Sequence, residues 1–254
     1  MHQAPLSRKA ILITRARQQQ QSLAERVRRH GGVPFSLPCL ELMPLLPNIR
    51  RAVKHMTAGD DVLFSSANGV HCFSRAINRL PRTVLAGMRV AAIGDKTAEA
   101  LRQMDVEPSL VANPASQQGM IECYRRHGLP QRLFFFRAET GGDTLPRFLI
   151  EQGVDVQLIH AYRMRCPIGD CTAIRGMLEH GEIDAVLLGS AQTARYYVRR
   201  IGDVKLADKP VVAVLSPQVA EAAKAAGLSV QVIAEHASFD ALLDALAEYF
   251  AKEK

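Results

Sequence analysis

Small polar and basic residues stand directly after several apolar runs of this 254-residue sequence, and their types suit the binding of anions. If each run is a strand followed by a helix, the turn between them carries free backbone N–H groups at a helix N-terminus, where anions bind. Serine, threonine and asparagine are also the usual helix N-caps, so capping is the alternative role at any single turn. Because these positions recur at strand ends, where doubly wound sheets bind ligands, we interpret them together as an anion-binding site. The candidate residues are Thr14, Arg15, Ser65, Ser66, Asn68, Gly94, Lys96, Thr97, Arg137, Ser190, Gln192, Ser216 and Gln218.

Tyr162 is a second kind of candidate, since a phenol can donate a proton to a reacting group. It lies in a long stretch of alternating apolar residues, 153–167, which begins at a glycine, ends at a proline and predicts a strand. Its alternative role is packing, because aromatic residues favour strands and an amphipathic ring suits a domain boundary. His160 is two residues away, so strand periodicity predicts that both side chains share one face.

The elements that would position these residues alternate along the chain between apolar runs and amphipathic helical segments, which predicts parallel sheets covered by helices. We expect strands at residues 10–13, 33–37, 61–64, 89–93, 106–111, 132–136, 154–164, 184–188, 211–214 and 228–233. The two halves of the chain are similar at an offset of about 122 residues, as in Asp-Val-Leu-Phe-Ser-Ser at 61–66 and Asp-Ala-Val-Leu-Leu-Gly-Ser at 184–190. The sequence therefore predicts an α/β fold with two similar doubly wound parallel-sheet domains from an internal duplication.

Residues 153–167 and an equivalent early stretch, 32–44, are each longer than an ordinary strand of about 5–6 residues. An over-long strand that starts in one core and ends elsewhere can cross between domains. We therefore predict a discontinuous first domain, residues 1–36 plus 167–254, and a second domain, residues 41–158, with crossing linkers at 37–40 and 159–166. The alternative is two contiguous lobes divided near residue 129.

Composition and motifs exclude several function classes. The net charge of +7 suits a polyanionic small molecule, but the basic residues are scattered and there is no Trp, so we expect no nucleic acid partner. No apolar run of about 18 residues and no signal-peptide pattern occur, and the five cysteines form no Cys-x-x-Cys pair, so we expect no membrane partner and a cytoplasmic location. The nucleotide-binding glycine motifs and clustered metal-ligand patterns are also missing from the sequence, so we expect neither a cofactor nor a metal.

Several stretches carry a family resemblance when they are taken together. They are Ile-Leu-Ile-Thr-Arg at 11–15, the proline-bounded Leu-Pro-Cys-Leu-Glu-Leu-Met-Pro at 37–44, Val-Leu-Phe-Ser-Ser-Ala-Asn-Gly-Val at 62–70, Ala-Ala-Ile-Gly-Asp-Lys-Thr-Ala at 91–98, Ala-Tyr at 161–162 and the tail Ala-Glu-His-Ala-Ser-Phe-Asp-Ala-Leu-Leu at 234–243. In this order and spacing they resemble the uroporphyrinogen-III synthase family. The resemblance covers almost the whole chain. Its specificity comes from the order and spacing of the motifs together. The sequence departs from the family pattern at Gln218 and Val219, where a threonine is common, and at Ala16, where proline is common.

The resemblance implies two α/β domains joined by a two-stranded linker. It implies conversion of the linear tetrapyrrole hydroxymethylbilane to uroporphyrinogen III, with loss of water, inversion of ring D and no cofactor. The substrate is then a small polycarboxylate tetrapyrrole, which a basic chain suits, and the family's candidate catalytic tyrosine falls on Tyr162. We expect a monomer. The alternatives are a two-lobed binding protein that closes on a small polyanion without chemistry, and a diverged paralogue of the synthase.

Overall fold

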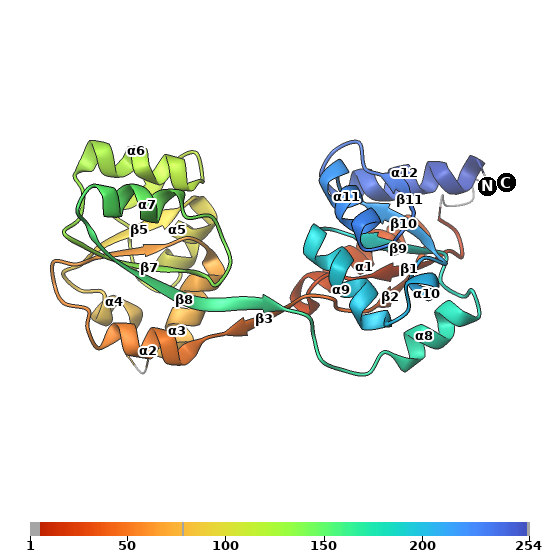
Figure 1. Ribbon diagram of the computed structural model, residues 1–254, viewed down its shortest axis with the longest axis horizontal. Coiled ribbons are helices and arrows are strands. Elements are labelled where there is room, and N and C mark those ends of the chain that lie inside the picture. Colours follow the sequence, from red (N-terminus) through yellow and green to blue (C-terminus); the bar gives the residue numbers. More distant parts are fainter. Residues whose placement is uncertain (1–5, 78, 253–254) are drawn as a thin grey trace. The chain divides into compact units, whose positions relative to one another are not determined.

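The chain forms two compact units in a computed structural model that describes residues 6–77 and 79–252. The first unit comprises Met1–Glu41 and Arg165–Lys254, and the second comprises Leu42–Met164. Each unit is a sheet with helices on both faces (Figure 1). The predicted α/β class with two domains is confirmed, and both units are described separately below.

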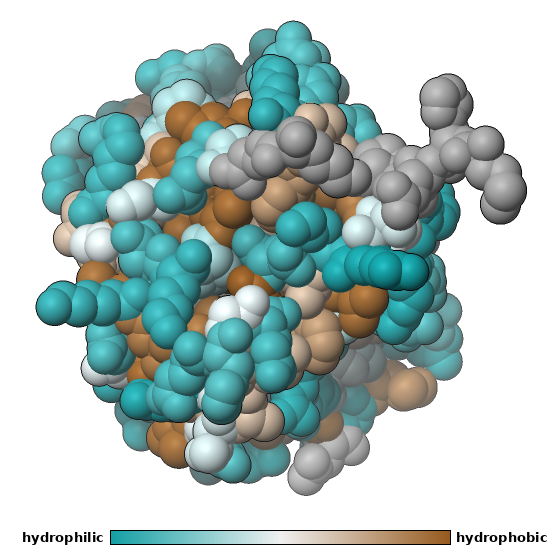
Figure 2. Space-filling model, turned by 90° about the vertical axis from the view of Figure 1, so that its right-hand side faces the viewer, coloured by the Kyte–Doolittle hydropathy of each residue, from teal (hydrophilic) through white to brown (hydrophobic). Residues whose placement is uncertain are grey.

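The first unit has a five-stranded sheet in the order β11-β10-β9-β1-β2, with parallel pairing throughout. Helices α1 and α12 pack on one face around Leu242 and Leu246, and helices α8 to α11 pack on the other around Tyr197. On the face of this unit in Figure 2, hydrophilic residues surround small groups of apolar ones. The strands are β1 (Ala10–Ile13), β2 (Val33–Ser36), β9 (Ala185–Leu188), β10 (Val211–Val214) and β11 (Val230–Ile233). The helices are η1 (Arg17–Gln19), α1 (Gln20–Arg29), α8 (Thr172–Glu179), α9 (Ala191–Ile201), α10 (Val204–Ala207), α11 (Pro217–Ala225) and α12 (Phe239–Lys252).

The second unit is built on a six-stranded sheet in the order β3-β8-β7-β4-β5-β6. Phe64, Phe73 and Phe136 form a buried aromatic group on one face, and α6 and α7 cover the other face around Tyr124. Its strands are β3 (Glu41–Pro44), β4 (Asp61–Phe64), β5 (Arg89–Ile93), β6 (Leu110–Ala112), β7 (Arg132–Ala138) and β8 (Asp155–Arg165). Its helices are α2 (Leu46–Val53), α3 (Ala67–Ala76), α4 (Pro81–Val84), α5 (Asp95–Arg102), α6 (Gln117–His127) and α7 (Thr144–Glu151). No helix in the described parts of the chain is long and apolar enough to span a membrane.

The two sheets have the same strand order under the equivalence that the sequence repeat suggests. When β1, β2, β9, β10 and β11 are matched to β7, β8, β4, β5 and β6, both orders coincide, and β3 is an addition at one edge. The five-stranded sheet therefore takes β1 and β2 from the first half of the chain and β9, β10 and β11 from the second half. The six-stranded sheet takes β7 and β8 from the second half and its other four strands from the first half. This arrangement is the expected result of a duplication in which the first strand–helix–strand units lie in exchanged sheets.

The two crossing stretches differ from each other. The early stretch is not one long strand: β2 belongs to the five-stranded sheet, β3 to the six-stranded sheet, and residues 37–40 lie between them. Pro38 has no N–H to donate, while the N–H groups of Leu37 and Cys39 bond back to Ile13 and Thr14, so the chain follows β1 before it leaves. The later stretch is a continuous strand, β8, whose register with β7 extends to Tyr162. The compact second unit therefore continues to Met164, whereas the sequence suggested a linker from residue 159.

Candidate active site

Two strand-to-helix turns of the second unit, those before α3 and α6, are held by serine N-caps. The Ser66 Oγ accepts from the Gly69 N–H at 3.3 Å at the start of α3, and the Ser116 Oγ accepts from the Gly119 N–H at 3.0 Å at the start of α6. Both serines have extended backbone conformations, as N-caps do. The capping role that we considered for Ser66 is therefore present in the structure. It leaves the other first-turn amides of α3 and α6 without intrahelical acceptors at the carboxyl edge of the sheet.

Tyr162 joins this edge through Ser66. The Tyr162 Oη lies 2.9 Å from the Ser66 Oγ, and either oxygen can be the donor. The tyrosine is only 7% exposed because its ring packs in the core with the aromatic group of the second unit. Its backbone is fixed as well, since the Tyr162 carbonyl accepts from the Glu139 N–H at 2.8 Å. A phenol with a fixed ring and a hydroxyl partner of its own is suited to proton donation at one position.

Gly94, Lys96 and Asn68 lie at the same strand ends. Gly94 is the residue before α5, with φ of +83°, and an added Cβ would lie 2.5 Å from the Ala115 Cβ, so the turns after β5 and β6 touch here. Lys96 and Asn68 are exposed. Lys96 lines a hollow of about 350 Å³ between α3 and α5 together with His71. The ammonium and amide groups are thus available to a ligand.

Three predicted residues of this unit are engaged inside the protein. The Thr97 hydroxyl is buried and donates to the Ile93 carbonyl at 3.0 Å. The Arg137 side chain is 6% exposed and pairs with Asp143 at 2.9 Å. The Ser65 hydroxyl makes a long contact of 3.5 Å with the Phe136 carbonyl. The sequence could not distinguish these internal contacts from ligand contacts, because all three residues come shortly after the expected ends of strands.

The predicted residues of the first unit form a separate group at the ends of β1, β9 and β10. Thr14 is fully buried and donates to the Leu187 carbonyl at 2.6 Å, so its hydroxyl is structural. The Arg15 guanidinium bonds to the Gln19 Oε1 at 2.7 Å and stacks on the Phe239 ring at 4.8 Å. Partial burial, and after it the charge of Arg26, lowers the pKa of Arg15 from its ordinary value.

The remaining candidates of the first unit lie at the starts of α9 and α11. Ser190 and Ser216 are N-caps, with Oγ atoms that accept from the N–H groups of Thr193 and Val219 at 3.1 and 3.4 Å. Gln192 donates to the Tyr196 hydroxyl at 3.1 Å, and Gln218 is exposed. In each unit the predicted residues therefore lie at or shortly after the ends of neighbouring strands.

His160 does not accompany Tyr162, contrary to the expectation from strand periodicity. In the register between β7 and β8, Arg137 pairs with His160, but the next residue, Ala138, pairs with Tyr162. One extra residue, Ala161, breaks the alternation in the manner of a β-bulge. His160 lines a cavity beside α2 instead.

Gln117 is a residue of this edge that the sequence did not reveal. Its Nε2 donates to the Gly142 carbonyl at 2.6 Å and its Oε1 accepts from the Leu145 N–H at 2.8 Å, which ties the start of α6 to the loop before α7. The available signal was the Ser-x-x-Gly sequence at 116–119, which repeats Ser-x-x-Gly at 66–69. Among the described residues, no group of three His, Cys, Asp or Glu side chains is placed to hold a metal ion.

Comparison with known proteins extends the resemblance seen in the sequence. A family model described as uroporphyrinogen-III synthase HemD matches residues 21–244. The chain belongs to the uroporphyrinogen-III synthase family. It is 28% identical over 204 residues to the uroporphyrinogen-III synthase of Synechococcus elongatus, covering 78% of this chain and 76% of that protein. It is 24% identical over 247 residues to the enzyme of the same name from Chlorobaculum parvum, covering 94% and 98%.

A further relative is longer than this chain. The porphyrin biosynthesis protein HemD of Ruminiclostridium josui is 25% identical over 252 residues, which are 96% of this chain but only 49% of that protein. The chain thus spans about half the length of that relative.

Solved structures of the family share the fold. A uroporphyrinogen-III synthetase from Helicobacter pylori gives a TM-score of 0.60 at 15% identity, and a mutant uroporphyrinogen III synthase from Thermus thermophilus gives 0.58 at 17% identity. Each match covers 96% of this chain and 99% of the other. At such low identity these structures support the fold alone.

Proposed function

We propose that the chain is a uroporphyrinogen-III synthase that converts hydroxymethylbilane to uroporphyrinogen III, with loss of water and inversion of ring D. The family match over residues 21–244 supports the reaction. The contact of 2.9 Å between the Tyr162 and Ser66 hydroxyls supports Tyr162 as the acid, because it gives the phenol a fixed partner at a strand-end turn. The monomeric state, the cytoplasmic location and the lack of a cofactor remain predictions from the sequence.

In the first step the departing hydroxyl of the substrate takes a proton and leaves as water. Phenols are protonated at neutral pH, as a proton donor must be. We assign the hydrogen of the Ser66 hydroxyl to the Tyr162 oxygen, which leaves the Tyr162 hydrogen for the substrate. In this arrangement the Ser66 hydroxyl fixes the direction in which the phenol hydrogen points. A positioned acid of this kind typically contributes about 10²–10⁴-fold to the rate.

Loss of water leaves an electrophilic azafulvene, which ring D attacks through its substituted carbon to give a spiro intermediate. The protein has to hold the two ends of the linear tetrapyrrole close together for this attack. Such positioning lowers the entropic cost of bringing the reacting atoms together. We propose that the first-turn amides of α3 and α6, the Asn68 amide and the Lys96 ammonium bind acetate and propionate groups of the substrate. Anions bind well at helix N-termini, and the exposed Lys96 adds charge there.

The first unit offers the substrate fewer uncommitted polar groups than the second unit does. Ser190, Ser216 and Gln218 offer turn amides and one exposed side-chain amide, and Arg15 keeps its charge as guanidinium groups do in proteins. Thr14 and Thr97 are left out of the proposed site, because both hydroxyls already donate to backbone carbonyls.

The test is the isomer composition of the product. The full chain is incubated with enzymatically generated hydroxymethylbilane, the products are oxidised, and isomers I and III are separated. We expect isomer III, with heat-denatured protein as the control that allows only spontaneous closure to isomer I. Isomer I alone from protein shown to be folded would contradict the synthase and favour a binding protein without chemistry.

A further inference from the structure

The second unit holds a cavity of about 460 Å³ beside α2, within the size range of small-molecule sites. Its apolar part is formed by Ala52, Phe134 and Ile159, and its basic part by Arg51 of α2, His55 of the turn after it and Arg132 of β7. Arg132 and Asp155 begin their strands, whereas Tyr162 lies near the carboxyl end of β8. The cavity therefore belongs to another part of the sheet than the site proposed for Tyr162.

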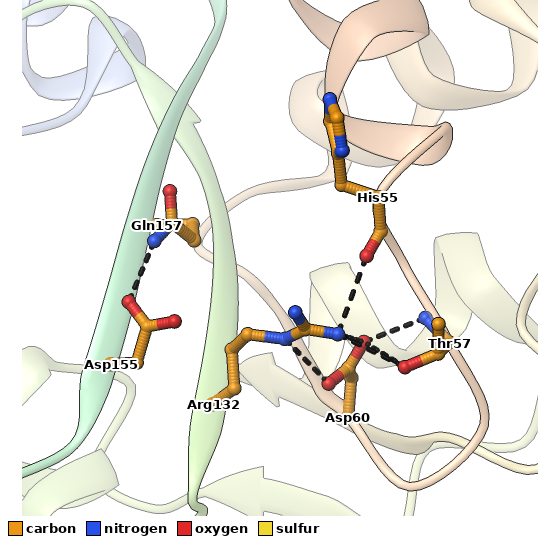
Figure 3. Close-up of polar contacts among 6 residues, drawn as sticks. All are labelled: His55, Thr57, Asp60, Arg132, Asp155 and Gln157. Atoms are coloured by element: carbon orange, nitrogen blue, oxygen red, sulfur yellow. Dashed lines mark hydrogen bonds and ion pairs between the residues drawn. The ribbon is translucent and has the colours of Figure 1, made fainter.

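Most of the basic groups in the cavity have no partner in the protein. Across the described parts of the chain, the side chains of Arg51 and His55 make neither a hydrogen bond nor an ion pair. The cavity has one carboxylate, Asp155, which already accepts from the Gln157 Nε2 at 2.6 Å (Figure 3). Arg51 therefore offers a ligand a guanidinium that has no partner among the described residues.

Arg132 is held in place before any ligand arrives. Its Nε and Nη2 donate to the two carboxylate oxygens of Asp60 at 2.8 and 2.7 Å, and Nη2 also donates to the Thr57 Oγ1 at 3.0 Å (Figure 3). The guanidinium lies 5.3 Å from the centre of the Phe134 ring. Its Nη1 has no partner among the residues that the structure describes. A guanidinium fixed in this way loses little conformational freedom when it binds, which favours affinity.

We infer that this cavity binds a small organic anion, with one carboxylate on a flat apolar ring. The carboxylate meets Arg51 and the Arg132 Nη1, and the ring lies against Phe134 and Ile159. Asp155 in the wall disfavours a dianion by like-charge repulsion, so a monocarboxylate fits better than a phosphate monoester. The inference does not depend on the proposed synthase activity.

The test is an NMR titration of the full chain with benzoate, its neutral isostere benzamide, and phenyl phosphate. We expect benzoate to saturate with a Kd on the order of 1 mM, as befits a ligand of so few atoms, with shifts in α2 and residues 155–160. Arg51→Gln should weaken benzoate at least about fivefold. Arg126→Gln is the matched control, since Arg126 is an exposed helical cation remote from the cavity lining, and it should leave the Kd unchanged.

Several results would overturn the inference. They are shifts that map outside α2 and β8, the same Kd in both variants, equal binding of benzamide, or no saturation by benzoate. Tighter binding of phenyl phosphate than of benzoate would refute the assignment to a monocarboxylate.

Discussion

Replacing Ser66 with alanine removes a helix cap and a contact to Tyr162 at once, so its effect has two parts that can be separated. The cap is worth about 1 kcal/mol of unfolding free energy. The hydrogen bond to the phenol adds about 1 kcal/mol. Ser116→Ala removes a cap of the same geometry from the same unit without touching a tyrosine. We therefore expect urea unfolding to give a loss of about 2 kcal/mol for Ser66→Ala and about 1 kcal/mol for Ser116→Ala.

The effect on the reaction should be more selective than the effect on stability. If the Ser66 hydroxyl donates to the Tyr162 oxygen, its loss leaves the phenol hydrogen without a fixed direction toward the substrate. The kcat for isomer III should then fall by about tenfold, which equals about 1.4 kcal/mol of barrier. Ser116→Ala should stay within about twofold of the wild type. The KM should change little in both, because proton transfer belongs to the transition state.

A double-mutant cycle decides whether Ser66 acts through Tyr162. In a Tyr162→Phe background there is no phenol hydroxyl left to orient, so Ser66→Ala should then lower kcat by less than about twofold. An equal loss of kcat in both backgrounds would refute the reasoning, as would a kcat for Ser66→Ala that matches that of Ser116→Ala.

Three further predictions concern Gly94, Asp60 and Lys96. Gly94→Ala should destabilise the protein by about 1–3 kcal/mol more than Gly128→Ala, since both glycines have similar positive φ but an added Cβ has a close neighbour only at position 94; equal melting temperatures would contradict the clash. Asp60→Asn should lower the unfolding free energy by about 2 kcal/mol near neutral pH. The hydrogen bond from Arg132 holds the pKa of Asp60 below its ordinary value, so this stabilisation is complete above the unfolded value of about 3.9 and is lost as pH falls through the folded one; a difference from the wild type that grows in acid would contradict the assigned cause. Lys96→Gln should raise the KM for hydroxymethylbilane at low salt and have less effect at 1 M salt, where the Debye length is about 3 Å; a salt-independent ratio of the two KM values would remove the electrostatic role.

The sequence predicted those elements whose apolar runs are buried on both faces. The strands β4 and β9 are such runs, and every residue in them is buried. The sequence-based prediction of a strand start was wrong at residues 106–111, where a proline interrupts the apolar run. The strand expected at 106–111 begins only at Leu110, because Val106 closes the end of α5 through a bond to the Leu101 carbonyl and Pro108 cannot donate.

The sequence predicted that small polar residues follow the strands, but not which of these residues contact one another. The repeated Ser-x-x-Gly pattern identifies helix starts, and parallel strands place them at one edge of the sheet. The pairing of Ser66 with Tyr162 joins residues that are 96 positions apart and depends on β7 lying between β4 and β8. The cavity beside Arg132 was invisible for the same reason, because its basic side chains come from separate parts of the chain.

The rate of isomer III formation by Tyr162→Phe tests the central claim most directly. The substitution keeps the ring in its core position and removes only the hydroxyl, so the unfolding free energy should fall by no more than about 1 kcal/mol. We predict that kcat for isomer III falls by at least about tenfold, while isomer I from spontaneous closure rises. Full isomer III activity in this variant would contradict the account, and the proton would then have to come from water or from the carboxylates of the substrate.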